Sequence, residues 1–264
     1  MHVHATAVID PAATIGANVR IGPGVVVGPD VTIGPDTVIG PHAVIHPYTT
    51  LGPGCRIHAG AVIGDIPQDL AFKDVVSRVR IGARCILREG VTIHRGTKEA
   101  SETVVGDDCY LMANSHLAHN VKLGNRVILA NGVLLGGYVE IDDGAFVSGN
   151  AVVHQFCRIG RLAMVGGISG VGKDVPPFCM TRSGSVNTVI GLNIVGLRRN
   201  GFSPEQRQMI RACFHTVYRE GLNVSQAVDV LKSRTDPLAR EWADFISQAK
   251  RGICKGSFLG ADEE

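Results

Sequence analysis

Aliphatic residues recur every six positions along most of this sequence. The first run contains Val3, Ile9, Ile15, Ile21, Val27, Ile33, Ile39, Ile45, Leu51, Ile57 and Ile63. The period returns at Ile81, Leu87 and Ile93, and the third run contains Val105, Leu111, Leu117, Leu123, Leu129, Leu135, Ile141, Val147, Val153, Ile159, Val165 and Val171. Four positions after the aliphatic residue comes a small or β-branched one, as at Val19, Val25, Val31, Thr37, Ala43, Thr49, Cys55 and Ala61.

A period of six matches neither an amphipathic helix nor a hairpin sheet, but it is typical of a solenoid of short strands. Each hexapeptide supplies one strand and one corner, and glycine, proline, asparagine or aspartate lets the backbone turn. The large aliphatic and the small residue point inward, and stacked coils bury a continuous core. The pattern therefore predicts an all-β solenoid.

The solenoid is expected over residues 1–190, with excursion loops near 65–80 and 97–103, where the corner glycines are lost. Paired Pro176 and Pro177 are expected to end the ladder of strands. Helical periodicity follows, so we expect a C-terminal α-helical domain over 191–264 that caps the open end of the solenoid. Its helices are predicted at 203–219, starting at Ser203-Pro204, then 225–233 and 237–250.

Composition narrows the class of protein. The 264 residues include 33 glycines, only 5% aromatic residues and a formal charge of +2, so nothing global indicates nucleic-acid binding. No stretch approaches the ~20 apolar residues of a membrane span, and the N-terminus lacks a secretion signal. Four of the seven cysteines occupy the small inward position of the repeat and are expected to be buried thiols: Cys55, Cys85, Cys109 and Cys157. We therefore expect a soluble protein of the reducing cytoplasm.

Histidines gather where the repeat departs from its usual corner residues, namely at His94, His116, His119 and His154. Coils stack about 4.8 Å apart, so side chains at matching corners converge. A histidine there can act as a general base. Two further interpretations are compatible with the residues alone. The imidazoles can be bonded to neighbouring carbonyl groups, or His94, His116 and His119 can hold zinc.

Several strings occur in an order that resembles the UDP-N-acetylglucosamine acyltransferase family, which starts lipid A synthesis. They are IPQDL at 66–70, IHRGT at 93–97, HLAHN at 116–120, GNRVILAN at 124–131, HQFCRIG at 154–160, MVGG at 164–167, DVPPF at 174–178 and GLRRNGF at 196–202. The resemblance implies a left-handed parallel β-helix with three hexapeptides per turn. It also implies a homotrimer with active sites between subunits, which transfers a 3-hydroxyacyl chain from acyl carrier protein to the 3-hydroxyl of UDP-N-acetylglucosamine.

The resemblance also implies residue roles. His119 matches the catalytic base, and the N–H of Gly137 matches the donor to the oxyanion. Positions that hold the sugar nucleotide match Gln68, Asp69, His116, His154, Gln155, Asn193, Arg198 and Arg199. Gly167 matches the position that limits acyl length. No metal and no cofactor are implied, because the acyl group is carried on the phosphopantetheine of acyl carrier protein.

Four positions depart from the family pattern: Ala71 replaces a lysine, Tyr138 a histidine, Asn120 an aspartate and Val195 an acidic residue. These departures leave room for a 3-amino acceptor in place of the 3-hydroxyl. The hexapeptide pattern is also compatible with the N-acyltransferase of a later lipid A step, an acetyl-CoA acetyltransferase, a trimeric zinc carbonic anhydrase and a non-catalytic scaffold. Between Arg198 and Arg251 the tail has ten Lys/Arg and six Asp/Glu. We expect tail arginines, among them Arg207, Arg211 and Arg219, to dock the acidic carrier protein.

Overall fold

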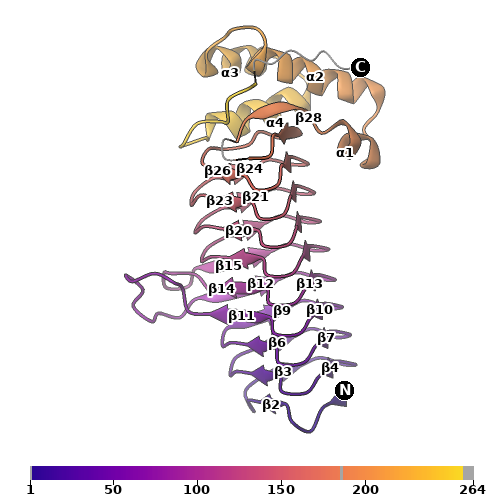
Figure 1. The fold of residues 1–264 in the computed structure, drawn as a ribbon, viewed down its shortest axis with the longest axis vertical. Helices are drawn as coiled ribbons and strands as arrows, with labels where there is room; N and C mark the ends of the chain where they lie inside the picture. The colour runs from indigo at the N-terminus through magenta and orange to yellow at the C-terminus, as the bar shows by residue number, and fades with distance from the viewer. Residues whose placement is uncertain (1, 185–186, 258–264) are drawn as a thin grey trace.

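The computed structural model describes residues 2–184 and 187–257, which form a long stack of coils closed at one end by helices (Figure 1). Each short strand pairs in parallel with the strand one coil further on, so that Val3 lies opposite Ile21 and Leu117 opposite Leu135. Three hexapeptides therefore complete one turn. The fold is the left-handed parallel β-helix that the family resemblance implies.

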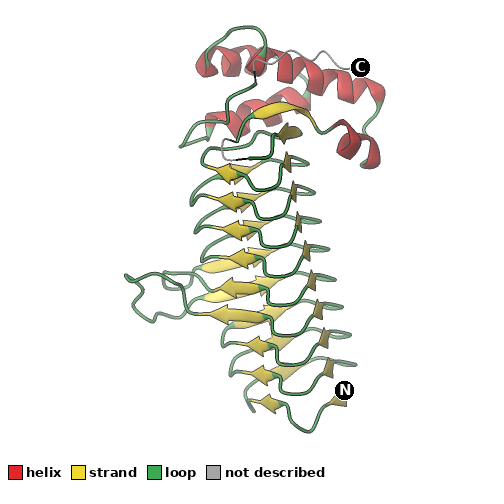
Figure 2. Cartoon of the chain, in the orientation of Figure 1, coloured by secondary structure: helices red, strands yellow, loops and turns green. Residues whose placement is uncertain are grey.

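The stacked coils form a three-sided prism, and each side of the prism is one sheet (Figure 2). Sheet A contains β1 (His2–Val3), β4 (Arg20–Ile21), β7 (Val38–Ile39), β10 (Arg56–Ile57), β13 (Ile86–Leu87), β16 (Tyr110–Leu111), β19 (Ile128–Leu129), β22 (Phe146–Val147), β25 (Met164–Val165), β27 (Cys179–Thr181) and β28 (Val189–Leu192). Sheet B contains β2 (Val8–Ile9), β5 (Val26–Val27), β8 (Val44–Ile45), β11 (Val62–Asp65), β14 (Thr92–His94), β17 (His116–Leu117), β20 (Leu134–Leu135), β23 (Val152–Val153) and β26 (Gly170–Val171). Sheet C contains β3 (Thr14–Ile15), β6 (Thr32–Ile33), β9 (Thr49–Leu51), β12 (Arg78–Ile81), β15 (Glu102–Val105), β18 (Lys122–Leu123), β21 (Glu140–Ile141) and β24 (Arg158–Ile159).

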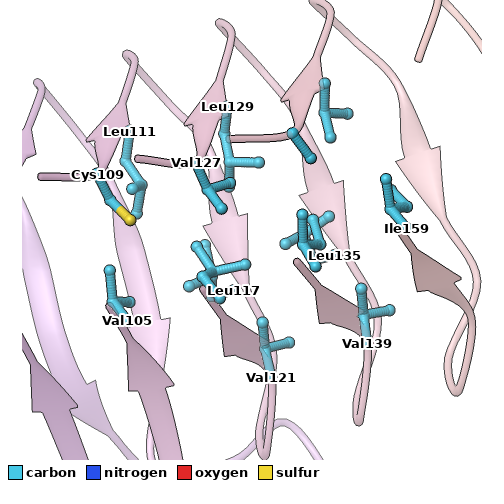
Figure 3. Close-up of a cluster of buried hydrophobic side chains, with 14 of the residues drawn as sticks. Val105, Cys109, Leu111, Leu117, Val121, Val127, Leu129, Leu135, Val139 and Ile159 are labelled. Carbon is cyan, nitrogen blue, oxygen red and sulfur yellow. The ribbon is translucent and has the colours of Figure 1, made fainter. Parts of the chain in front are cut away.

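The interior is filled by the two inward positions of the repeat (Figure 3). Leu117 and Leu135 show the pattern, with the small Val121 and Val139 filling the corners after them, and all four are at most 1% exposed. The four cysteines expected inside are buried as well. The burial of one aliphatic residue per strand stabilises each coil only when the next coil covers it.

Three series of corners connect the sheets. The AB corner, between sheets A and B, includes residues 112–115, 130–133, 148–151 and 166–169. The BC corner, between sheets B and C, includes 118–121, 136–139 and 154–157. The CA corner, between sheets C and A, includes 124–127, 142–145 and 160–163. Both excursion loops leave the BC corner. They span 66–77 and 95–101, so each ends earlier than expected, because β12 begins at Arg78 and β15 at Glu102.

The expectation that Pro176 and Pro177 end the ladder is wrong. Val175 pairs with Ile159, and Met180 in β27 pairs in parallel with Met164. The prolines lie at a corner, where the ladder needs no N–H from them. Sheet A then ends with β28, which pairs antiparallel to β27.

The tail contains α1 (Ile194–Arg199), α2 (Pro204–Tyr218), α3 (Val224–Ser233) and α4 (Pro237–Ser247). The second has the predicted Ser203 cap, completed by Gln206 in a capping box. The first helix is one that the periodicity did not predict, and the last ends three residues before the expected Lys250. Residues 258–264 of the expected helical domain lie outside the described residues.

The helices close the last coil through both packing and ion pairing. Trp242 of α4 is fully buried. Arg161 of the CA corner forms a bidentate salt bridge with Glu241, with hydrogen bonds of 2.8 and 2.6 Å. Arg158 donates to the carbonyl of Phe245. Among the described residues, no helix is long and apolar enough to span a membrane.

Candidate active site

Three predicted site residues occupy one corner position in successive coils. His119, Gly137 and Gln155 each lie two residues after the buried aliphatic of β17, β20 and β23, whose aliphatics are Cα partners across the ladder. The BC corner therefore aligns them in one column. Near the N-terminus the matching repeat position is proline, as at Pro23, Pro29, Pro35, Pro41, Pro47 and Pro53.

The prolines show that the ladder does not need an N–H at this position, since proline has none. In the described part of the chain, the N–H of Gly137 accordingly donates to no backbone carbonyl. This amide is free to bind an acceptor from outside the chain. An unpaired backbone N–H at a rigid corner is a suitable donor to a developing oxyanion.

His119 lies directly over Gly137. A Cβ built on this glycine would be 2.6 Å from Nε2 of the imidazole, and its contact with Cε1 would be closer still. Any larger residue would displace the ring. The absence of a side chain at 137 therefore brings the imidazole and the free amide to one place.

The other side of the imidazole is held by two of the residues that depart from the family pattern. Nδ1 of His119 is 3.1 Å from Oδ1 of Asn120, and the Tyr138 ring meets the imidazole edge to face at 5.3 Å. Tyr138 in turn stacks on Phe156 at 5.1 Å. Asn120, Tyr138 and Phe156 share a left-handed corner conformation, with φ of 60°, 60° and 65°. Asparagine tolerates this conformation better than most residues.

Thr97 and Phe156 are contacts of this site that the sequence analysis missed. Both the N–H and the hydroxyl of Thr97 donate to Oδ1 of Asn120, at 3.1 and 3.0 Å. The signal for Thr97 was available, since it ends the IHRGT string. Phe156 belongs to the HQF string, but neither string indicates which of its members faces His119.

His94 and His116 form a second histidine pair one coil apart, on β14 and β17. Their rings meet edge to face at 4.9 Å, and Nδ1 of His116 shares a hydrogen bond of 2.7 Å with the hydroxyl of Thr92. Burial lowers the pKa of His116 to about 4, with a smaller contribution from the neighbouring His94. Burial lowers the pKa of His94 as well. Both imidazoles are therefore neutral at pH 7.

The carbonyl-bonded interpretation applies to His154, whose Nδ1 is 2.9 Å from the carbonyl oxygen of Gln155. His116 bonds a hydroxyl instead, and the buried Nδ1 of His94 has no hydrogen-bond partner among the described residues. In the part of the chain that the structure describes, no group of three or more His, Cys, Asp or Glu side chains could hold a metal ion.

Gln68 and Asp69 lie on the 66–77 loop, which projects from the BC corner (Figure 1). Oδ1 of Asp69 accepts the N–H of Ala71, which fixes the turn. The loop is attached to the solenoid by Arg95, which is 9% exposed and contacts Asp74 at 2.9 Å and the carbonyl of Val75 at 3.3 Å. The Arg95 guanidinium also lies over the Phe72 ring, at 5.3 Å from its centroid.

The remaining predicted residues lie on other edges of the prism. Gly167 belongs to the AB corner, where an added Cβ would meet the Gly149 carbonyl oxygen at 3.3 Å. Asn193 caps α1 by accepting the N–H of Gly196, and it donates to the carbonyl of Leu162 at the CA corner. Val195, Arg198 and Arg199 belong to α1, and all three are exposed there. One chain therefore does not bring these residues together with His119.

The β-helix of hexapeptide repeats places this chain in the class of hexapeptide-repeat transferases. The family model described as "Bacterial transferase hexapeptide (six repeats)" matches residues 12–47, 30–65 and 102–137. The model described as "Udp N-acetylglucosamine O-acyltransferase; Domain 2" matches 174–254.

An acyl-[acyl-carrier-protein]–UDP-N-acetylglucosamine O-acyltransferase of Burkholderia lata is 42% identical over 260 residues, which is 96% of this chain and 99% of that protein. The solved UDP-N-acetylglucosamine acyltransferase of Bacteroides fragilis is 39% identical with a TM-score of 0.92, and the alignment covers 96% of this chain and all of that one. A solved relative from Acinetobacter baumannii is 38% identical, with a TM-score of 0.92 over 97% of this chain and all of that one. The chain belongs to the acyl-[acyl-carrier-protein]–UDP-N-acetylglucosamine O-acyltransferase family.

Proposed function

We propose that this enzyme transfers a 3-hydroxyacyl chain from acyl carrier protein to the 3-hydroxyl of UDP-N-acetylglucosamine, the first step of lipid A synthesis. The names of the relatives include acyl-[acyl-carrier-protein] and UDP-N-acetylglucosamine, which supports these two substrates. The single observation that carries the mechanism is the position of the His119 imidazole over Gly137, whose N–H is unpaired among the described residues.

In this mechanism Nε2 of His119 removes the proton from the sugar 3-hydroxyl as that oxygen attacks the thioester carbonyl. The carbonyl oxygen becomes an oxyanion, which the Gly137 N–H stabilises. When the tetrahedral intermediate collapses, the carbon–sulfur bond breaks and the imidazolium returns its proton to the phosphopantetheine thiolate. These steps account for every bond and proton of the acyl transfer without a metal, a further cofactor or a covalent acyl-enzyme.

A homotrimer with the site between neighbouring chains is part of the proposal. His119, Gly167 and Asn193 lie on or next to three different edges of one prism, so a site that uses all of them needs more than one chain. The outer faces support this arrangement. Sheet B exposes Val8, Val26, Leu134 and Val152 by 41–64%, whereas sheet C carries charged pairs such as Arg80–Glu102 and Lys122–Glu140.

Within that site we assign sugar-nucleotide binding to Gln68, Asp69, His116, His154, Gln155, Asn193, Arg198 and Arg199. The two arginines of α1 suit phosphate oxygens, and neutral His116 suits hydroxyl groups of the sugar. Gly167 is assigned to the far end of the acyl chain. The basic tail is assigned to the carrier protein, and the enzyme to the cytoplasm.

The test is a mass-spectrometric transfer assay with a ladder of 3-hydroxyacyl carrier proteins. UDP-N-acetylglucosamine and its 3-amino analogue are offered separately, with His119→Ala as the inactive variant and His154→Ala as a variant that retains the base. We expect ester product that disappears in His119→Ala. Product with the amine alone would correct the acceptor but keep the mechanism. Transfer that survives in His119→Ala would overturn the assignment of the base.

A further inference from the structure

Three polar groups lie within hydrogen-bond distance of one oxygen beside the proposed base. Oδ1 of Asn120 is 3.1 Å from the backbone nitrogen of Thr97, 3.0 Å from its hydroxyl and 3.1 Å from Nδ1 of His119. Asn120 is 7% exposed, and its own N–H donates to the hydroxyl of Thr103 at 2.8 Å. The amide therefore has little freedom to move.

An asparagine side chain can present either its oxygen or its NH₂ group to a neighbour, and the two arrangements have nearly the same shape. Here the neighbour decides between them. A backbone N–H can only donate, so the atom that faces Thr97 must be the acceptor. The hydroxyl adds a second donor, because the Tyr138 hydroxyl, 3.1 Å away, can donate to Oγ1 of Thr97 and leave the Thr97 proton for Asn120.

The same oxygen faces His119. Because Oδ1 can only accept, Nδ1 of the neutral imidazole must carry its hydrogen, and the lone pair is left on Nε2. Nε2 is the nitrogen that lies over Gly137. If the amide were reversed, its NH₂ group would favour the other tautomer, in which Nε2 carries the hydrogen and cannot take a proton from the substrate.

We propose that Thr97 is a positioning residue for the base: it fixes the orientation of the Asn120 amide, and the amide fixes the tautomer of His119. The N–H and the hydroxyl of Thr97 together hold this orientation. An aspartate at 120 would not require it, since both oxygens of a carboxylate accept. The proposal rests on His119 being the base of the proposed function.

The direct test is long-range ¹H–¹⁵N correlation spectroscopy on ¹⁵N-histidine-labelled enzyme, with His119 assigned by its loss in His119→Ala. We expect the wild-type ring to carry hydrogen on Nδ1. Thr97→Val removes the hydroxyl but keeps the N–H, and we expect it to shift part of the population to the other tautomer. We expect kcat to fall by roughly five-fold, the usual effect of one neutral hydrogen bond, with KM almost unchanged. Thr97→Ser should restore both, and Thr50→Val on the exposed face of sheet C is the matched control.

The decisive variant pair uses the Asn120→Asp background. A carboxylate cannot be reversed, so Thr97→Val should there change neither the tautomer nor kcat. An equal fall in kcat in both backgrounds would mean that Thr97 acts only structurally, and the proposal would be overturned. Hydrogen on Nε2 of the wild-type ring would overturn it too. The spectrum needs no substrate, so absence of acyl transfer would contradict the proposed function without deciding the tautomer.

Discussion

The imidazole of His119 covers the α-carbon of Gly137 from the neighbouring coil, with room for no more than a hydrogen atom between them. Both residues occupy the same position of the repeat, eighteen residues apart. The register of the solenoid thus places the proposed base beside the proposed backbone donor, although the two residues are far apart in the sequence.

Replacement of Gly137 by alanine should therefore inactivate the enzyme while leaving it folded. The methyl group would meet Nε2 at 2.6 Å and push the ring away from the reacting oxygen. A displacement of about 1 Å can cost about 100-fold in rate. We expect a loss of at least that size in kcat with an unchanged melting temperature. Gly172→Ala is the control, since a Cβ there meets no atom within 4 Å. Nearly normal activity of Gly137→Ala would contradict this geometry.

The buried imidazole of His116 should make the protein less stable in mild acid. Its native pKa of about 4 lies below the ordinary value of 6.5, so between these values the unfolded chain binds more protons. The free energy of unfolding must then fall as the pH falls. We expect this group to contribute a loss of about 2 kcal/mol per chain between pH 7 and pH 5. Guanidinium unfolding of wild type and His116→Gln at both pH values measures it, and equal losses would exclude the effect.

A larger side chain at Gly167 should shorten the acyl chain that the enzyme accepts. The nearest neighbours of a Cβ there are the Gly149 carbonyl oxygen at 3.3 Å and Cβ of Ser148 at 3.7 Å, so Gly167→Met can fold but would occupy space beside the AB corner. Each methylene that no longer fits should cost about four-fold in kcat/KM, the value of about 0.8 kcal/mol for a buried methylene. Competition among acyl carrier proteins of graded length measures the shift. An unchanged preference would remove Gly167 from the acyl site.

Charge reversal on the tail should weaken binding of the acidic carrier protein. Of the three arginines predicted to dock it, Arg207 donates to the carbonyl of Phe202 and Arg219 to that of Ser257, while Arg211 is exposed. We expect Arg211→Glu to raise KM for the acyl carrier protein by about three- to ten-fold at low salt, and less at high salt. Arg20→Glu, at the opposite end of the solenoid, serves as the control. Turnover unchanged at low salt would contradict the docking role.

Loss of the Arg95 guanidinium should loosen the loop that carries Asp69. Its contacts with Asp74, Val75 and Phe72 attach that loop to the solenoid. For Arg95→Met we expect KM for the sugar nucleotide to rise about ten-fold with little change in kcat, and trypsin to cut faster after Lys73. Arg88→Met, which removes an arginine paired with Glu89, is the matched control. A protease-resistant loop in Arg95→Met would show that other contacts hold it.

Most of the fold was predictable because each hexapeptide repeats one physical requirement. The inward aliphatic and the small residue four positions later are visible in the sequence, and so is the Ser203 cap of α2. The coil after Val175 was missed because prolines were judged as strand residues, whereas their place at a corner makes them compatible with the ladder. Helix α1 has only six residues, too few for a clear helical period.

The site was only partly predictable. The eighteen-residue spacing between His119 and Gly137 is visible in the sequence, but only the family resemblance singled out Gly137. Neither the period nor the resemblance says which side chains approach these residues from an excursion loop. The contact between Thr97 and Asn120 joins residues 23 apart, and it depends on a loop conformation that has no period. The distribution of His119, Gly167 and Asn193 over separate edges likewise follows from three-dimensional register, which short sequence strings do not reveal.

The stacked coils also fix the distances along the solenoid axis in steps of one coil. His119 and Gly167 are 48 residues apart, between two and three coils, which at about 4.8 Å per coil corresponds to roughly 13 Å along the axis. A symmetry axis parallel to the solenoid would leave this offset unchanged from one chain to the next. Insertion of one eighteen-residue coil between them would lengthen it by a single fixed increment. Under the proposed role of Gly167, the accepted chain length would change in large steps with whole coils and in small steps with one corner side chain.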